Sequence, residues 1–471
     1  MSRVNSTIII ERLKALFSEK EPENRLLTDE ANLKHYGSDW SRFADPAALA
    51  IALPASIEQV QAIVKLANEL NFALVPSGGR TGLSGGALAA QGEVVVAFDA
   101  MNKILDFNAA DSTVICQAGV VTQQLQNFAE QNNLFYPVDF ASSGSSQIGG
   151  NIATNAGGIK VIRYGLTRDW VRGLKVVTGA GEILELNNGL IKNATGYDFR
   201  HLFIGSEGTL GFIVEATMEL CPQPKNLSVL VLGVAELTDL MKILQHFQSV
   251  IPLTAFEFFS HQAMQQVLQH SDVSAPFADA APFYALLEFE LSSEALEQAV
   301  MDAFEYCVEQ GWAVDGVQSQ SLAQLKSLWR LREGISESIA VRTPYKNDIS
   351  VLVSQVPDFL NQVQAVVTQH YPDFELIWFG HIGDGNLHLN ILKPAHLEKA
   401  EFFAQCKKVS AWVFEIVQQF HGSISAEHGV GLLKKHALHY SRSAAEIELM
   451  RQVKKVFDPN GVMNPGKVFD V

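Results

Sequence analysis

Two histidines enclose a short glycine-rich stretch, His381-Ile-Gly-Asp-Gly-Asn-Leu-His388, with apolar runs on either side. Asp-Gly is a preferred pair for a two-residue hairpin turn, so Asp384 and Gly385 predict a turn between two strands. That register places His381 directly opposite His388, where cross-strand partners share a face with Cβ atoms about 5 Å apart. Two imidazoles at this spacing suit a metal ion, and an amphipathic hairpin with two ordinary histidines satisfies the same pattern.

A second polar cluster, Ser425-Ala-Glu427-His428-Gly429, follows towards the C-terminus. Its carboxylate and its imidazole come within reach of the hairpin if the chain folds back. Imidazole together with carboxylate forms a ligand set for a divalent metal such as Zn, Fe or Mn. The cluster strengthens the metal interpretation, but it does not by itself identify a reaction.

Length, charge and cysteine content limit the class of protein. A chain of 471 residues is long enough for two or three domains with real cores. Its net charge of −16 argues against nucleic acid as a partner, because nucleic acid attracts a basic surface. The four cysteines are scattered without a Cys-x-x-Cys motif, which indicates a reducing compartment. No segment resembles a secretory signal or a membrane span. We expect a cytoplasmic protein, with peripheral association at the inner membrane face left open.

The first part of the chain alternates between strand and helix patterns. Residues 1–45 read as a helical lead-in, and residues 47–53 as the first strand. Ser56 and Gln59 have capping-box spacing ahead of a helix with apolar residues at helical period. The composition changes near Cys221-Pro-Gln-Pro224, where we place a domain boundary. The domains expected are therefore 1–222, 223–420 and a C-terminal segment 421–471, the second being α+β with helices packed on an antiparallel sheet.

Three glycine-rich segments in the first domain have the composition of an anion-binding site. They span residues 76–86, 142–158 and 205–213, with Ser, Thr and Asn between the glycines. Glycines let backbone N–H groups approach an anion closely, and hydroxyl groups add donors. None is a G-x-G-x-x-G dinucleotide fingerprint or a Walker A loop. Tight turns alone explain one such loop more easily than three, so the set predicts a phosphate-bearing cofactor.

These motifs together resemble flavin-dependent dehydrogenases of the vanillyl-alcohol-oxidase superfamily, in the D-2-hydroxy acid dehydrogenase group. The resemblance covers essentially the whole chain and is nearest to the D-2-hydroxyglutarate dehydrogenase branch. Its motifs are Pro76-Ser-Gly-Gly-Arg-Thr-Gly82, Ile148-Gly-Gly-Asn-Ile-Ala-Thr-Asn-Ala-Gly-Gly158, Lys192-Asn-Ala-Thr-Gly-Tyr-Asp198, Gly205-Ser-Glu-Gly-Thr-Leu-Gly211, Gly380-His-Ile-Gly-Asp-Gly-Asn-Leu-His388, Glu427-His-Gly429 and Asn464-Pro-Gly-Lys467.

The resemblance implies an α+β fold with a two-part FAD-binding domain, a substrate or cap domain with an antiparallel sheet, and a C-terminal helical segment. That segment is expected to complete the active site and return to the FAD domain. Some relatives tether FAD through a histidine in the first glycine loop; Arg80 stands there in Gly78-Gly79-Arg80, so we expect non-covalent FAD. The implied cofactor-binding residues are Pro76, Ser77, Gly78, Gly79, Arg80, Thr81, Gly82, Ser145, Ser146, Gly149, Gly150, Asn151, Thr154, Asn155, Gly158, Glu207, Gly211, Ile213 and Asn464.

For the substrate, the resemblance implies a D-2-hydroxy acid with a second carboxylate, such as D-2-hydroxyglutarate. Arg332, Ser336 and Lys346 match the residues that bind the dicarboxylate in that branch, with serine where some relatives have threonine. Arg332 and Ser336 are spaced one helical turn apart, which places both on one helix face. An acidic protein needs such local cations to bind a dianion, although isolated surface charges are the commoner role of these residue types.

The resemblance also divides the roles within the histidine motifs. His381, His388 and Glu427 are expected to bind a divalent metal, with zinc favoured, that chelates the substrate hydroxyl and its adjacent carboxylate. His428 is expected to accept the hydroxyl proton as the hydride passes to flavin N5. Asn386 is expected to hydrogen-bond the substrate.

Three alternatives remain open at this stage. One is a D-lactate or glycolate dehydrogenase of the same family. Another is a zinc hydrolase that uses His381, His388 and Glu427 with water, which leaves the glycine loops unexplained. The third is a non-catalytic flavin-binding subunit. For a dehydrogenase we expect a quinone or an electron-transfer flavoprotein as electron acceptor, and a homodimer is an open possibility.

Overall fold

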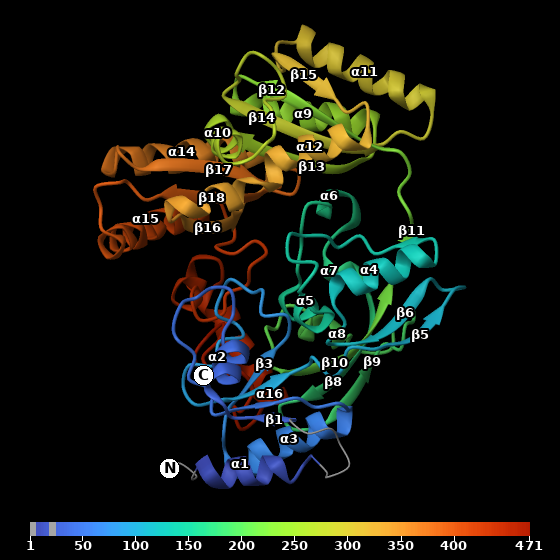
Figure 1. Ribbon diagram of the computed structural model, residues 1–471, viewed down its shortest axis with the longest axis vertical. Helices are drawn as coiled ribbons and strands as arrows, with labels where there is room; N and C mark the ends of the chain where they lie inside the picture. The colour runs from blue at the N-terminus through green and yellow to red at the C-terminus, as the bar shows by residue number, and fades with distance from the viewer. Residues whose placement is uncertain (1–5, 18–24) are drawn as a thin grey trace. The chain divides into compact units, whose positions relative to one another are not determined.

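The computed structural model describes residues 6–17 and 25–471, which form two compact units (Figure 1). The first unit contains the chain up to residue 157, residues 166–223 and residues 427–471. The second contains residues 158–165 and 224–426. Residues 1–5 and 18–24 of the expected helical lead-in lie outside the described residues. Its described part holds α1 (Ser6–Lys14), β1 (Leu26–Leu27) and α2 (Glu30–Gly37).

The first sheet of the first unit has the strand order β1-β2-β4-β3. Strands β2 (Ala50–Ala52) and β3 (Leu74–Ser77) both run parallel to β4 (Val94–Ala97). Helix α3 (Ile57–Leu70) connects β2 to β3, and its first turn is capped by the Ser56 side chain, which accepts from the Gln59 N–H. The helix buries its apolar stripe in the core, so β3 ends at a fixed place and delivers the first glycine loop.

The second sheet of this unit is antiparallel, with the order β5-β6-β10-β8-β9. Helix α5 lies within the second glycine segment, and β10 begins in the last residues of the third. The elements of this part are β5 (Ile104–Asn108), β6 (Thr113–Gln117), α4 (Thr122–Gln131), β7 (Leu134–Phe135), α5 (Ile148–Thr154), α7 (Thr167–Trp170), β8 (Val171–Thr178), β9 (Ile183–Leu186), α8 (Arg200–Phe203), β10 (Gly211–Glu219), β11 (Cys221–Pro222), η3 (Lys435–Tyr440) and α16 (Ala444–Phe457).

The second unit is built on one seven-stranded antiparallel sheet with the order β15-β12-β14-β13-β17-β18-β16 (Figure 1). Its strands are β12 (Leu227–Val234), β13 (Leu253–Ser260), β14 (Phe283–Glu290), β15 (Asp315–Gln318), β16 (Tyr345–Ser350), β17 (Glu375–Gly380) and β18 (Asn386–Leu392). Its helices are α6 (Val161–Tyr164), α9 (Leu237–Val250), α10 (His261–His270), α11 (Glu294–Glu309), α12 (Leu322–Glu333), α13 (Ile335–Ser338), η1 (Ala340–Arg342), η2 (Val353–Gln355), α14 (Val356–His370) and α15 (Lys399–Gln419).

One hydrophobic core of this unit lies where α10, α12 and α13 pack on the sheet. It joins apolar residues of β12, β13, β14 and β17 to buried residues of those helices. The mixed helix and antiparallel-sheet architecture confirms the expected α+β fold class. Within the described chain, the helices are too short or too polar to cross a bilayer.

The predicted register of the histidine hairpin was wrong. Phe379, not His381, lies opposite His388 in the β17–β18 ladder, and residues 381–385 form a turn longer than two residues. The His381 carbonyl accepts from the N–H groups of Asp384 and Asn386, while the Gly383 N–H donates to Phe256. Gly385 has a φ of +83°, and a Cβ there would collide with the Val351 carbonyl oxygen. Contacts with Phe256 on β13 and with Val351, just after β16, therefore shape a turn that the Asp-Gly preference alone does not predict.

Candidate functional site

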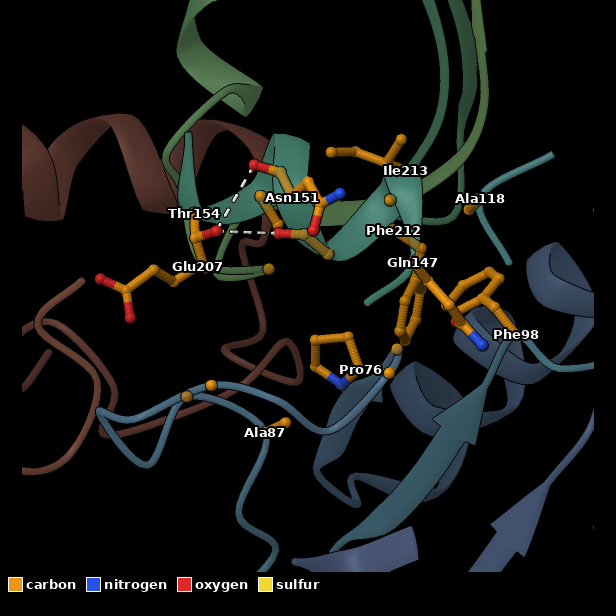
Figure 2. Close-up of a pocket in the computed structure, with 18 of the residues that line it drawn as sticks. Pro76, Ala87, Phe98, Ala118, Gln147, Asn151, Thr154, Glu207, Phe212 and Ile213 are labelled. Atoms are coloured by element: carbon orange, nitrogen blue, oxygen red, sulfur yellow. Dashed lines mark hydrogen bonds between the residues drawn. The ribbon is translucent and has the colours of Figure 1, made fainter. Parts of the chain in front are cut away.

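A cavity with about 950 Å³ of open space lies in the first unit, between all three glycine-rich segments (Figure 2). Thirteen of the nineteen residues expected to bind the cofactor line it: Pro76, Gly78, Gly79, Arg80, Thr81, Gly82, Gly149, Gly150, Asn151, Thr154, Glu207, Gly211 and Ile213. The six that do not line it are Ser77, Ser145, Ser146, Asn155, Gly158 and Asn464.

Several lining residues were missed by the sequence reasoning. Figure 2 shows Phe98 and Phe212 beside Gln147, and the two rings have centroids 5.8 Å apart. Most of these residues lie within the three glycine-rich segments, so the segments could have identified them. Phe98 and Ala118 lie outside the segments and are ordinary apolar residues with no local signal. The missed residues are Ser84, Gly86, Ala87, Phe98, Ala118, Gln147, Ala153, Ser206, Gly208 and Phe212.

The cavity depends on close approach between glycine segments. A Cβ on Gly79 would lie 2.7 Å from the Cα of Ser146, so a side chain there would force the first two segments apart. Gly208 has a φ of +70°, and a Cβ there would collide with the Pro76 ring. Glycine is therefore needed at both positions to bring the backbones together.

Two buried hydroxyl groups hold the second segment in place. The hydroxyls of Thr122 and Ser146 are 2.7 Å apart, and the Asn151 side-chain amide donates to Thr122 at 2.6 Å. Thr154 donates to the Gly150 carbonyl oxygen at 3.1 Å (Figure 2). The Ser146 hydroxyl thus supports the wall of the cavity and does not line it. Buried hydrogen-bonded chains of this kind fix a single conformation.

The polar groups around the cavity fit a polar cofactor. The buried Gln147 Oε1 has no hydrogen-bond donor among residues 6–17 and 25–471, and such an atom calls for a bound partner. Arg80 has a φ of +60°, and its guanidinium donates to the Gly78 carbonyl oxygen at 2.8 Å. The same guanidinium lies 3.5 Å from Asp99 and over the Tyr36 ring at 4.6 Å. Arg80 therefore shapes the loop through its own contacts.

Glu207 links the cavity to the segment that carries His428. Its carboxylate accepts from the N–H groups of Val430 and Gly431 at 2.7 and 2.8 Å. Burial raises the pKa of Glu207, and the two N–H donors oppose that rise. Asn464 donates to the carbonyl oxygens of Gly86 and Glu207 at 2.9 and 2.8 Å, so it supports the cavity from behind.

Within the first unit, His428 is half-buried and lies two residues before Val430. Its Nε2 is 3.7 Å from the carboxylate of Glu427. Glu207 lines the cavity and accepts a hydrogen bond from the backbone close to His428, so it anchors that backbone beside the cavity. This places an imidazole, a common acid–base group, on a segment anchored beside the cofactor cavity.

The histidine hairpin of the second unit still brings its two imidazoles together despite its different register. Ring nitrogens of His381 and His388 lie within 4.8 Å of each other, and the ring centroids are 5.3 Å apart. A buried carboxylate stands beside each ring: Glu257 Oε1 is 2.8 Å from His381 Nδ1, and Asp348 Oδ1 is 3.7 Å from His388 Nδ1. Paired imidazoles backed by carboxylates are typical of metal sites in proteins.

Asn386 lies beside the same histidines. Its side-chain amide donates to Asp348 Oδ1 at 2.9 Å and to the Ile349 carbonyl oxygen at 3.1 Å. Both bonds are buried, so they fix the direction of the amide group. The residue starts β18, two positions before His388, and therefore belongs to the same end of the sheet.

Arg332 is buried on α12 beside Glu257 and Phe379. Its guanidinium is 2.8 Å from Glu257 Oε2 and lies over the Phe379 ring at 4.8 Å. The Nη2–H is not aligned with the carboxylate, so the contact is a close charge pair without a hydrogen bond. Nε and Nη2 are buried and lack acceptors in the described part of the chain. Unsatisfied donors of this kind are expected where a ligand binds.

The two other predicted substrate residues are more open to solvent. Ser336 is exposed on α13, whereas Arg332, one turn earlier, is buried. Lys346 is exposed on β16, in the ladder position opposite Asn390 and two residues before Asp348. Partial enclosure by protein lowers the pKa of Lys346, although its side chain still reaches water.

Family models match both units. An FAD binding domain matches residues 48–187, and the C-terminal domain of FAD linked oxidases matches residues 223–468. A D-2-hydroxyglutarate dehydrogenase of Stutzerimonas stutzeri is 63% identical over 461 residues, covering 98% of each chain. A protein of that name from Xanthomonas citri is 56% identical over 95% of each chain. The mitochondrial protein of Arabidopsis thaliana is 34% identical over 96% of this chain and 80% of its own.

Solved structures share the fold at low sequence identity. A substrate-bound p-cresol methylhydroxylase has a TM-score of 0.76 at 15% identity, covering 98% of this chain and 97% of its own. The 4-ethylphenol oxidase of Gulosibacter chungangensis has a TM-score of 0.76 at 17% identity over the same shares. These likenesses confirm the vanillyl-alcohol-oxidase type of fold. The chain belongs to the FAD-linked oxidase family and is an FAD-dependent dehydrogenase.

Proposed function

We propose that the protein oxidises D-2-hydroxyglutarate, or a closely related D-2-hydroxy diacid, to the 2-oxo acid. The observation that carries the substrate class is the buried guanidinium of Arg332, whose Nε and Nη2 lack acceptors among the described residues. A second substrate carboxylate would satisfy both donors, since guanidinium and carboxylate form paired hydrogen bonds. Relatives at 63% and 56% identity carry the name D-2-hydroxyglutarate dehydrogenase, which supports the same choice.

Lys346 and Ser336 are proposed to act with Arg332 on the diacid. Lys346 supplies a second cation on the strand that also carries Asp348. A dianion bound to a protein of net charge −16 requires such local positive charge. A monocarboxylate such as lactate leaves one of these cations without a ligand, so the pair favours the diacid.

FAD is proposed to bind non-covalently in the cavity of the first unit. The thirteen lining residues expected from the sequence provide backbone N–H groups and hydroxyl groups, and Arg80 stands where a tethering histidine would be needed. Two predicted residues outside the lining, Ser146 and Asn464, support the same loops through their hydrogen bonds. Bound FAD supplies the acceptor for the hydride.

A divalent metal is proposed at His381, His388 and Glu427, and the ligand types favour zinc. The two imidazoles and the carboxylates beside them fit such an ion. Glu427 follows Ser423 by four residues, and Ser423 pairs with Ser350 at the end of β16. Four residues span at most about 14 Å, so chain connectivity keeps Glu427 near that end of the sheet. A metal held by these residues would polarise the substrate hydroxyl.

His428 is proposed as the base that accepts the proton of the substrate hydroxyl. Imidazole is the side chain that most often serves as a general base in enzymes. Its segment is anchored to Glu207 of the cofactor cavity. Asn386, whose amide group is fixed by Asp348, is proposed to orient the substrate. A quinone or an electron-transfer flavoprotein is proposed to reoxidise the protein in the cytoplasm or at a membrane surface.

Anaerobic single turnover tests this function. Mixing the flavin-loaded protein with excess D-2-hydroxyglutarate should bleach the flavin and give one 2-oxoglutarate per FAD. Bleaching without 2-oxoglutarate would overturn the assigned reaction. Metal analysis of the active protein tests the ion separately, and active protein without a bound divalent ion would exclude its proposed role.

A further inference from the structure

One buried carboxylate contacts both the proposed metal site and the proposed diacid site. Glu257 lies on β13 and is 1% exposed, so water does not screen its charge. Its Oε1 is 2.8 Å from His381 Nδ1, and its Oε2 is 2.8 Å from Arg332 Nη2. Because the two contacts use different oxygens, Glu257 serves both side chains at the same time.

The contact with His381 determines which ring nitrogen faces a ligand. An ionised carboxylate only accepts hydrogen bonds, so Nδ1 of His381 carries the hydrogen. The ring then presents Nε2 as its electron-pair donor, which is the form that binds a metal. A carboxylate behind a ligating histidine fixes its tautomer and orientation, and losing it typically weakens metal binding 10–100-fold.

The contact with Arg332 fixes a cation without using all its hydrogen-bond donors. Glu257 neutralises the guanidinium, and the Phe379 ring lies beneath it at 4.8 Å. Nε and Nη2 nevertheless remain without acceptors in the parts of the chain that the structure describes. The arginine is therefore held in place while two N–H groups stay available for a substrate carboxylate.

We propose that Glu257 is a positioning residue that orients the metal ligand His381 and the diacid-binding Arg332 together. This inference rests on the proposed function, because it deepens the roles assigned there to His381 and Arg332. Glu257 acts through these two side chains and exchanges no proton with the substrate. One carboxylate thereby couples the geometry at the two ends of a 2-hydroxy diacid.

The adjacent strand offers a matched control. Glu288 on β14 is 2% exposed and is 2.7 Å from Lys160 Nζ. It also accepts from Thr254 at 2.7 Å and from the Trp329 ring N–H at 2.9 Å. Glu288→Gln therefore breaks a buried ion pair in the same sheet, as Glu257→Gln does, and it leaves His381 and Arg332 with their partners.

The experiment measures zinc affinity of the FAD-loaded protein after chelator treatment, by competition with a zinc-binding dye. Glu257→Gln should weaken zinc binding 10–100-fold, whereas Glu288→Gln should stay within about twofold of the starting protein. Equal zinc affinity in Glu257→Gln and the starting protein would overturn the inference. If the starting protein itself binds no zinc, the proposed metal site fails instead, and the two failures are thus distinguishable.

A paired substitution keeps the test valid if a single variant does not fold. Glu257→Gln/Arg332→Gln removes both charges, and Glu288→Gln/Lys160→Gln does the same at the control site, so neither leaves a buried charge unpaired. The first pair should lose zinc affinity 10–100-fold and the second should retain it. Retained affinity in both pairs would contradict the positioning role of Glu257.

Discussion

Glu207 and Gly431 are joined by a hydrogen bond of 2.8 Å between a buried carboxylate and a backbone N–H, although 224 residues separate them in the chain. Glu207 lines the cofactor cavity, and Gly431 lies three residues after His428. The bond therefore connects the cofactor cavity to the proposed catalytic segment within one unit. Geometry set in this way can keep a base in place beside a bound substrate.

Glu207 should give a distinctive pH dependence of stability. Burial raises its pKa in the folded protein above the ordinary value of 4.5, so the folded state holds the proton more tightly. The stabilisation that protonated Glu207 contributes is complete below about pH 4.5. It is lost as the pH rises through the raised pKa of the folded state. The difference in free energy of unfolding between the starting protein and Glu207→Gln should therefore change across that window.

Denaturant unfolding at a series of pH values, followed by flavin release, measures this difference. Glu207→Gln also replaces one acceptor oxygen by an amino group, which leaves one backbone N–H unpaired at a cost of about 1–3 kcal/mol. Glu446→Gln is a control at an exposed position of the same unit. For this variant, the difference in free energy of unfolding from the starting protein should not show the same change as the pH rises above about 4.5. If the free energy of unfolding changed with pH in the same way for Glu207→Gln and the starting protein, the raised pKa of Glu207 would be refuted.

Gly79→Ala should disrupt the cofactor cavity. The added Cβ would lie 2.7 Å from the Cα of Ser146, so the backbone of two loops would have to move. Overpacking of this kind costs about 1–3 kcal/mol, and the displaced loop should bind FAD more weakly. Flavin retention on gel filtration and the melting temperature measure both effects. Gly144→Ala, where a Cβ meets no atom within 4 Å, should retain FAD normally; equal behaviour of the two variants would exclude the close-approach explanation.

His428→Asn should slow flavin reduction by about 10²–10⁴-fold while FAD remains bound. Asparagine has no group that titrates near neutral pH, so the substrate hydroxyl would lose its proton acceptor. Rapid mixing with D-2-hydroxyglutarate measures the rate, and the flavin spectrum verifies cofactor content. The exposed His436 on η3 provides the control, since His436→Asn should reduce flavin at the normal rate. Near-normal reduction in His428→Asn would remove it from the base role.

Lys346→Met should raise the KM for D-2-hydroxyglutarate by about tenfold, which is equivalent to about 1.4 kcal/mol. The KM for D-lactate should change little. The variant removes a cation proposed to bind only the second carboxylate. Stability should change by about 0.5 kcal/mol at most, because the side chain is exposed. Lys326→Met, on the exposed side of α12, supplies the control. If the KM rose by the same factor for both acids, Lys346 would not discriminate between them.

Local sequence signals predicted the elements that depend on local chemistry. The Ser56 cap and the apolar period of α3 lie within a few residues of one another, and the glycine loops carry their own composition. The predicted hairpin register was wrong because the turn depends on contacts with Phe256 and Val351, which are distant in the sequence. Local preference for an Asp-Gly turn could not outweigh those contacts.

Sequence motifs did not predict the carboxylate contacts that organise the site, because these contacts also join residues that are far apart in the chain. Glu257 is 124 residues from His381 in the chain, and nothing in its strand marks it as different from an ordinary charged residue. Glu207 was expected as a cofactor residue, but its bonds to Val430 and Gly431 were not. A motif identifies groups that meet the ligand, whereas the partners that orient them are determined by the fold.

The most direct test of the proposed function is anaerobic stopped-flow reduction of bound FAD by a panel of acids at equal concentrations. D-2-hydroxyglutarate should bleach the flavin with a second-order rate constant at least about tenfold above those of D-lactate and glycolate, because only the diacid engages both Arg332 and Lys346. L-2-hydroxyglutarate should leave the flavin oxidised. Faster bleaching by D-lactate or glycolate than by D-2-hydroxyglutarate would contradict the assigned substrate.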